Sequence, residues 1–451
     1  MPISPLLALL LAAPPPPGAA WSYDVTPGAD LSELAVEATF SGGSRLEVDP
    51  ESAPYVREVQ RVDGDKTAPL PGRGPWELSG CARGCKVRYR FQLRAAAQQL
   101  GDPDEAAVFG SIIESSPGAW LLRPTGDPAP GARYRLRVRS REGVRFATGL
   151  PSTGDLDTYE GPAEYVAMSP YSALGNFKVA TRSACTNEIQ VVIAPARWSV
   201  SEANLLDWVT SGARAVCDYF GKFPVAGGLV LVVPGRGFGK TLGGGGATTL
   251  IGVPEEMDLQ ELREGWVLVH EMVHTALPAL DRRHHWLEEG LATYLEPVVR
   301  ARAGALEPEK VWGDLVDGLP KGDLRGDENG LDDAPRWGPT YWGGALFWLK
   351  LDLEIRRHTK NARSLRDALR AVGAQGGSVA QPWPVERLLA ALDKGAGYPA
   401  AEPLYRAMGT RRMKSNLGAL WKALGVSLDG ERAVFDDRAP EASLRQAITA
   451  H

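Results

Sequence analysis

The sequence predicts an α+β protein of several domains, in which β-rich segments come first and helices come last. Its 451 residues, 44% hydrophobic and 23% charged, have a globular composition and enough length for two to four domains. Between Trp21 and about Pro170, short alternating runs such as CKVRYRFQLR (85–94) are separated by Gly, Pro and Asp. This pattern is typical of an antiparallel β-sandwich or barrel. From Asp258 onward the apolar residues recur mainly at helical spacing.

The central elements follow from local patterns. Segment 200–223 has helical spacing, with Ser201 as its N-cap, and the glycine-rich run 234–254 leads into a short strand over 247–253. Charged, glycine-rich residues predict a solvated loop over 322–338. The other strands predicted here cover 177–181, 188–195 and 227–233. The later helices are predicted over 258–277, 286–303, 341–357, 363–372, 384–393 and 416–424.

These patterns divide the chain into a signal peptide (1–20), a β-sandwich domain (21–170), a mixed central domain (171–303) and a helical C-terminal domain (304–451). In 1–20 an apolar run is followed by prolines and then by small residues ending at Ala20. This order indicates export to the periplasm or the extracellular space. The alternative is a disordered apolar leader. No later segment has 18 uninterrupted apolar residues, so no transmembrane segment is expected.

The four cysteines fit an exported protein. Their even number indicates disulfide pairing, and proximity favours Cys81 with Cys85 and Cys185 with Cys217. The alternative is four reduced, buried thiols.

Composition and motif spacing argue against two classes of ligand. The net charge of −5 provides no basic surplus for a phosphate backbone, so nucleic-acid binding is not expected. GRGFGKT (235–241) is similar to a P-loop, but it has three residues where that loop needs four. A β run follows it instead of a helix, and we therefore reject nucleotide binding.

The histidines carry the main chemical signal. The chain has six, and four of them lie between residues 270 and 285. His270-Glu271-Met272-Val273-His274 places two imidazoles four residues apart, on one face of a helix, where both can bind one metal ion. Glu271 lies beside them and can accept a proton from metal-bound water. The pattern predicts a catalytic zinc site, one ion per chain.

A third ligand is expected from the next helix, WLEEGLATYLE (286–296). A carboxylate there would complete a His2Glu set and leave a fourth position open for water. Glu288 and Glu289 are adjacent, and geometry alone does not choose between them.

Here the chain resembles the gluzincin metallopeptidases, which include the aminopeptidase N and glycyl aminopeptidase families. The resemblance rests on His-Glu-x-x-His followed by Trp-Leu-x-Glu-Gly, and the spacing to the second motif is shorter than in aminopeptidase N. It implies a thermolysin-like catalytic domain with Glu289 as the zinc ligand. It also implies that Glu296 supports a zinc-binding histidine from the second shell.

The resemblance extends to two further segments. Tyr341, in Tyr-Trp-Gly-Gly, matches the family tyrosine that stabilises the oxyanion, although Tyr294 competes for that role. The glycine-rich run 243–247 matches an edge strand along the cleft, which makes Gly245, Gly246 and Ala247 candidate substrate-binding residues. This run has no acidic residue to hold a substrate amine, and exopeptidase and endopeptidase activity both stay open.

The predicted function is thus hydrolysis of peptide or protein substrates by a zinc metallopeptidase with Glu271 as general base. The alternative is a non-catalytic zinc-containing binding protein on the same scaffold. We interpret His284 and His285 as an exposed linker pair and His358 as an exposed helix-end residue. Four tryptophans could line a groove, and core packing is the simpler interpretation for all except Trp342; the four are Trp312, Trp337, Trp342 and Trp348.

Overall fold

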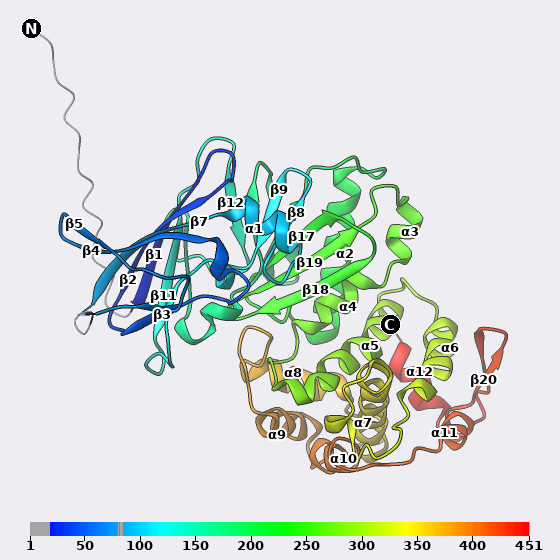
Figure 1. Ribbon diagram of the computed structural model, residues 1–451. Helices are drawn as coiled ribbons and strands as arrows, with labels where there is room; N and C mark the ends of the chain where they lie inside the picture. Colours follow the sequence, from blue (N-terminus) through cyan, green and yellow to red (C-terminus); the bar gives the residue numbers. More distant parts are fainter. Residues whose placement is uncertain (1–18, 80, 82–83, 451) are drawn as a thin grey trace, which may run out of the picture.

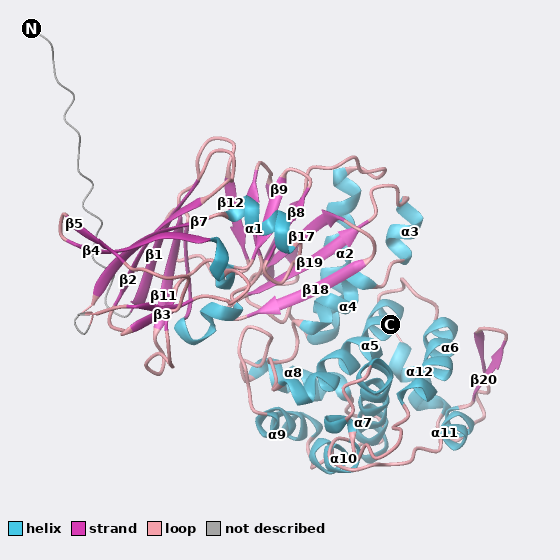
Figure 2. Ribbon diagram, viewed as in Figure 1, coloured by secondary structure: helices cyan, strands magenta, loops and turns pink. Residues whose placement is uncertain are grey.

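A computed structural model describes residues 19–79, 81 and 84–450 (Figure 1). The predicted signal peptide lies outside the described residues except for Ala19 and Ala20, which begin the first strand. The β-rich part precedes the helical part, as the sequence predicts (Figure 2). The two segments meet at a central sheet that carries strands β17, β18 and β19.

The largest sheet lies in the N-terminal region and has seven strands in the order β13-β11-β1-β2-β7-β4-β5. Neighbouring strands within this sheet are antiparallel, except β1 and β11, which are parallel. An all-antiparallel sandwich is therefore wrong in this detail, because strands so distant in sequence can meet in either direction. The seven strands are β1 (Ala19–Pro27), β2 (Leu34–Phe40), β4 (Val56–Asp63), β5 (Lys66–Pro69), β7 (Cys85–Phe91), β11 (Arg133–Val138) and β13 (Thr158–Pro162).

Two smaller sheets and one helix complete this region. The three-stranded sheet has the order β10-β3-β6 and the four-stranded sheet the order β12-β14-β9-β8. Their elements are β3 (Arg45–Glu47), β6 (Trp76–Glu77), α1 (Leu93–Leu100), β8 (Ala106–Phe109), β9 (Ile112–Ser115), β10 (Arg123–Pro124), β12 (Arg145–Thr148) and β14 (Ser172–Gly175).

The four-stranded sheet is buried on both faces. Ile113 and Leu174 belong to the core of the N-terminal region, whereas Ile112 and Ala173 belong to a core shared with the central sheet. Since side chains alternate along a strand, each neighbouring pair divides between the two faces. This sheet therefore fixes the N-terminal region against the sheet that supports the candidate site.

The central sheet has the order β15-β16-β17-β19-β18, so β18 lies at one edge. β16, β17 and β19 run parallel, and β18 is antiparallel to β19. Its strands are β15 (Val179–Ala184), β16 (Asn187–Ile193), β17 (Leu229–Pro234), β18 (Phe238–Gly243) and β19 (Ala247–Val253). The predicted glycine-rich loop is thus largely a strand, because its glycines permit extended backbone as well as turns.

One buried core joins the central sheet to all the later helices, from Ala184 to Ile448. The predicted division at residue 303/304 therefore stays a prediction. The helices are α2 (Glu202–Phe220), α3 (Leu259–Glu264), α4 (Val267–His274), α5 (His285–Arg302), α6 (Pro308–Gly318), α7 (Gly344–His358), α8 (Leu365–Ala374), α9 (Val385–Ala396), α10 (Ala401–Met408), α11 (Leu417–Leu424) and α12 (Ala442–Thr449). A hairpin of β20 (Val426–Asp429) and β21 (Arg432–Phe435) precedes α12.

The helix predicted over 258–277 is two helices. Asp258 caps α3 as expected, through a capping box with Glu261. Gly265 then adopts an extended ψ of 130° and ends α3, and α4 begins at Val267. Because glycine is free to leave the helical region, it separates the two segments at this position.

Both predicted disulfides are confirmed, Cys81–Cys85 and Cys185–Cys217. The second ties the turn between β15 and β16 to α2. Among the described residues no helix combines the length and hydrophobicity that a membrane span requires.

Candidate metal centre

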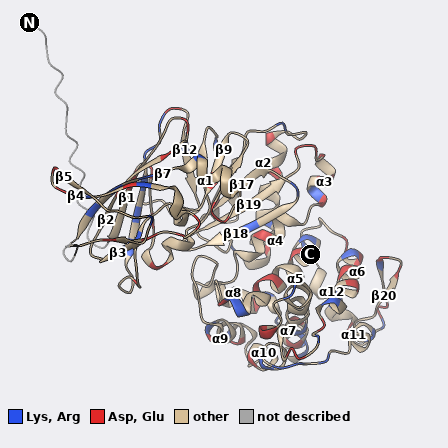
Figure 3. Cartoon of the chain, viewed as in Figure 1, with Lys and Arg blue, Asp and Glu red and all other residues tan. Residues whose placement is uncertain are grey.

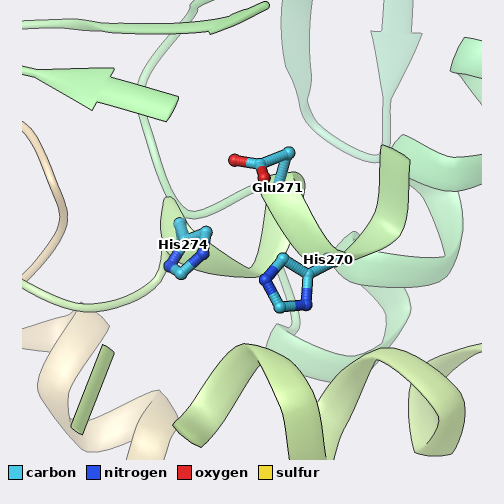
Figure 4. Close-up of side chains that lie close together, drawn as sticks. All are labelled: His270, Glu271 and His274. Atoms are coloured by element: carbon cyan, nitrogen blue, oxygen red, sulfur yellow. The ribbon is translucent and has the colours of Figure 1, made fainter. Parts of the chain in front are cut away.

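Helix α4 presents the two histidines of the predicted site. Their ring centroids lie 5.0 Å apart, and Figure 4 shows the rings side by side on one face of α4, with the Glu271 carboxylate projecting from another. Ligand-type atoms of His270, Glu271 and His274 all lie within 4.8 Å of one another. The i, i+4 spacing therefore produces the predicted pair.

Helix α5 brings Glu289, and not Glu288, to these histidines. Glu289 Oε2 lies 3.4 Å from His270 Nε2 and 3.6 Å from His274 Nε2. Ligand atoms around a tetrahedral zinc, with bonds of about 2.0–2.1 Å, are separated by about 3.3–3.4 Å. The three groups thus have the donor types and the spacing that a zinc ion requires.

Glu288 has other partners. Its Oε2 lies 3.0 Å from His285 Nδ1, and its Oε1 accepts a hydrogen bond of 3.0 Å from the backbone nitrogen of Leu280. These contacts fix the linker before α5, so Glu288 holds the polypeptide in place rather than facing α4.

His285 is a site residue that the sequence interpretation missed. It begins α5, and its Nε2 lies 3.3 Å from Glu289 Oε1. Its side chain is half-exposed and lines the cleft. The available signal was the i, i+4 spacing of His285 and Glu289. It would have placed both side chains on one face if the helix had been predicted to begin at residue 285 instead of 286.

His284 also departs from the exposed linker that we predicted. It is buried, with Nδ1 2.9 Å from Asp332 Oδ1, and the Tyr405 hydroxyl donates to Asp332 Oδ2 over 2.6 Å. The two adjacent histidines thus serve different regions, because His284 anchors the 322–338 loop and His285 faces the cleft. His358 is exposed at the end of α7, as predicted.

The charges within the cluster are strongly coupled. Burial by itself would raise the pKa of Glu289, but hydrogen bonds from His270, His274 and His285 outweigh burial and hold that pKa far below 4.5. Hydrogen bonds to Glu288 and then Glu289 raise the pKa of His285 to about 10. The cluster therefore favours an anionic Glu289, which is the form that binds a metal cation.

Tyr341 reaches the site from a π-helical turn, Pro339–Gly343. Its ring is stacked on that of His270, with centroids 6.4 Å apart, and burial followed by Glu289 raises its pKa above the usual value. A Cβ at Gly290 would collide with the backbone of Gly344, so these glycines allow α5 and α7 to approach closely enough to bring Tyr341 to Glu289. The competitor Tyr294 is buried and donates to Asp352 Oδ2 over 2.9 Å, away from the site.

The edge strand β18 passes directly above α4. Thr241 Oγ1 donates a 2.8 Å hydrogen bond to the Glu271 carbonyl, and a Cβ at Gly239 would collide with the Glu271 side chain. A cleft of about 620 Å³ lies between this strand and the helices. Asp104 of the N-terminal region also lines it and accepts bonds of 2.7 Å from both Lys240 and Tyr171.

Two predicted roles need correction. Gly245 and Gly246 lie in the turn after β18, Ala247 begins β19, and none of the three lines the cleft. The Gly245 nitrogen donates to the Ala380 carbonyl, and the Ala247 nitrogen to the Gly149 carbonyl. The edge that faces the site is β18 itself, because the glycine run forms the turn between β18 and β19 instead of the edge strand. Glu296 is buried and bonds to Arg300 over 2.8 Å, rather than to a histidine of the site.

The tryptophans also differ from expectation. Trp312 and Trp348 are core residues, as predicted, whereas Trp337 is 61% exposed and stacks on Tyr341 with centroids 6.0 Å apart. Trp342 is only partly buried, and it lines a second cavity beside the site.

Comparison with solved structures identifies the architecture. An aminopeptidase N family protein from Idiomarina loihiensis superposes with a TM-score of 0.68 at 14% identity, covering 90% of this chain and 78% of that one. The fold is that of the M1 zinc metallopeptidases. An M1 zinc metallopeptidase from Deinococcus radiodurans matches with a TM-score of 0.53 at 17% identity, over 89% of this chain and 94% of that one.

A variant of the Deinococcus enzyme bound to a Tyr-Ser-Ala substrate matches with a TM-score of 0.55 at 17% identity, over 89% of this chain and 95% of that one. No family model matches the sequence, and no curated protein matches it in sequence. The gluzincin resemblance therefore holds in the fold, at identities too low to carry function by themselves.

Proposed function

We propose that this chain is an exported zinc metallopeptidase that hydrolyses peptide bonds. The observation that carries the proposal is the convergence of His270, His274 and Glu289, from two helices, with Glu271 and Tyr341 beside them. One zinc ion held by the first three groups would supply a Lewis acid for the scissile carbonyl and a lowered pKa for water. The proposal includes two predictions from the sequence: the signal peptide over 1–20 and the division of the remaining chain into domains over 21–170, 171–303 and 304–451.

The protein's own groups perform the proton transfers. Glu271, buried beside the cleft, accepts a proton from the attacking water and passes it to the leaving amine. The Tyr341 hydroxyl donates to the developing oxyanion. β18 offers unpaired backbone groups at the sheet edge, with which an extended substrate can pair.

The alternative of a non-catalytic zinc protein has less support. A structural zinc site is closed by four protein ligands, whereas here a potential base and a hydroxyl donor face the same cleft as the three ligand groups. Neither group would serve a site that only holds the fold together.

Substitution of Glu271 is the decisive test. Glu271→Gln keeps the size of the side chain and removes the base, so kcat/KM should fall by about 10²- to 10⁴-fold. Zinc content, measured by elemental analysis, should stay at one ion per chain. Full activity in this variant would contradict the mechanism, and absence of cleavage of every peptide by the parent protein would favour the binding-protein alternative.

Tyr341→Phe tests the oxyanion donor separately. We expect kcat to fall by about 10²- to 10³-fold with little change in zinc content, because only the hydroxyl is lost. Tyr294→Phe is the matched control, since its hydroxyl bonds to Asp352. An equal loss of activity in the two variants would remove Tyr341 from the proposed role.

The choice between exopeptidase and endopeptidase depends on an anchor for the substrate amine. The acidic residues that line the described cleft are Asp104, Glu271, Glu288 and Glu289, and each already has a partner or a proposed role. We therefore favour an endopeptidase or an unusual aminopeptidase. An endopeptidase should cleave peptides with free and acetylated N-termini at similar rates, whereas strict dependence on a free amine would favour the unusual aminopeptidase.

A further inference from the structure

A second cavity opens beside the candidate metal centre. Its volume is about 910 Å³, and it shares Trp266, His270 and Tyr341 with the cleft under β18. The proposed zinc ligand His270 and the proposed oxyanion donor Tyr341 thus form part of the wall between the two spaces. A side chain entering the second cavity would belong to a substrate residue close to the scissile bond.

Exposed tryptophans distinguish this cavity. All thirteen tryptophans lie in the described part of the chain, and only two are exposed: Trp266 at 53% and Trp337 at 61%. Both line this one cavity. Tryptophan is an unusually large apolar surface to leave in water, so two of them at one place indicate a binding surface.

The residues of the site hold both rings. Trp337 is stacked on Tyr341, with an interplanar angle of 27°, and Trp266 meets the His270 ring edge-on with centroids 5.2 Å apart. The indole faces are therefore positioned by the groups that would perform the chemistry.

The rest of the lining is acidic. Five acidic residues line the cavity against two basic ones; the acidic residues are Glu264, Glu296, Glu307, Asp314 and Asp317, and the basic ones are Arg300 and Lys310. Arg300 pairs with Glu296, and Lys310 pairs with Asp314. Both basic residues are thus neutralised within the cavity. Figure 3 marks acidic residues in red along α6, which carries Asp314 and Asp317. Asp317 pairs in turn with Lys321, which lies over the Trp342 ring, and a formal charge of −2 remains, on Glu264 and Glu307.

We propose that this cavity is a subsite for a basic substrate side chain, Lys or Arg, with Trp266 and Trp337 as its aromatic walls. The inference rests on the proposed peptidase function and names its substrate class. A cation over an indole face is attracted by the ring quadrupole, and the excess of carboxylates adds to that attraction. A neutral apolar side chain would gain the aromatic contact and not the charge complementarity.

The test compares peptides that differ in charge alone. The substrates are internally quenched peptides in which one residue is varied. Arg, citrulline or Leu is placed in turn at each of the two positions that flank the scissile bond. Citrulline has the shape of Arg without its charge, so the Arg/citrulline ratio of kcat/KM isolates the cation. We expect Arg to be preferred about tenfold or more over both neutral residues at one of the two positions.

Variants then locate the preference. Trp337→Ala should lower the Arg/citrulline ratio by about fivefold, the loss expected for one cation–π contact, and Trp337→Phe should restore much of it. Glu307→Gln, at an exposed position just before α6, should lower the ratio without removing an aromatic ring. Val434→Ala, another exposed apolar residue outside both cavities, is the control and should leave the ratio unchanged.

Three outcomes would overturn the subsite: equal cleavage of Arg and citrulline peptides, preference for Leu over Arg, or an unchanged ratio in both Trp337→Ala and Glu307→Gln. Failure of the peptidase function would look different. In that case no peptide would be cleaved, or cleavage would survive in Glu271→Gln.

Discussion

Glu289, which is largely buried, and Glu114, which is fully buried, are two carboxylates in opposite electrostatic environments. Glu289, on α5, faces the imidazoles of His270, His274 and His285 within 3.3–3.6 Å, and its pKa is strongly lowered. Glu114, on β9, is fully buried, and neither of its oxygens has a hydrogen-bond partner among the described residues.

The pKa of Glu114 moves in the other direction. Burial, and then the charge of Asp104, raise it well above the model-peptide value of 4.5. Burial disfavours the charged form in both places, so the partners decide the sign. A buried carboxylate surrounded by imidazoles can hold a cation, and one without partners holds a proton instead.

Glu289→Gln should have the largest effect, because it gives Glu289 the neutral character of Glu114. Loss of the anion removes a proposed metal ligand, and activity should fall by about a thousandfold or more. Zinc content measured after dialysis should fall well below one ion per chain. Glu288→Gln, its neighbour on α5, is the control and should retain most of the zinc. Full zinc content in Glu289→Gln would show that the histidines bind zinc without this carboxylate. The contrast between Glu289 and Glu114 would then have no consequence for metal binding.

Glu114→Gln should change the pH dependence of stability. The folded-state pKa of Glu114 is raised, so the folded chain holds a proton that the unfolded chain releases above pH 4.5. The stability of the parent protein therefore falls, through this group, by about 1.4 kcal/mol per pH unit from pH 4.5 up to the folded-state pKa. The glutamine variant has no such loss.

Chemical unfolding of the parent and of Glu114→Gln at pH 4.5 and pH 7 measures this effect. The difference in free energy of unfolding should move in favour of the variant as the pH rises. Glu142→Gln, at an exposed position, should give the same difference at both pH values. A pH-independent difference for Glu114→Gln would show that Glu114 is ionised in the folded chain.

Local spacing predicted α4 and its histidines, because two residues four apart on a helix must share a face. Glu289 and Tyr341 could be named only from the family resemblance, since the tertiary packing of α5 against the π-helical turn brings them to α4. The contact of Asp104 with Lys240 joins the N-terminal region to the central sheet, and it left no local pattern in the sequence.

Other errors came from element boundaries and solvent exposure. Placing the edge strand on the glycine run 243–247, rather than on the residues before it, misplaced the substrate edge by a few residues. Trp337 lies in the segment 322–338 that was predicted as a solvated loop, and its exposure follows that loop rather than the core packing that we expected for its side chain.

His285 provides the smallest and sharpest test, because a one-residue error in the start of α5 concealed it. Its Nε2 supports Glu289 Oε1 from four residues away, so His285→Ala should leave the ligand carboxylate less well oriented. We expect zinc affinity, measured by competition with a chelator, to weaken by about 10- to 100-fold with the protein still folded. His358→Ala, at an exposed helix end, is the control. Unchanged affinity in His285→Ala would mean that His270 and His274 alone fix Glu289, and that the environment of this carboxylate depends on two imidazoles instead of three.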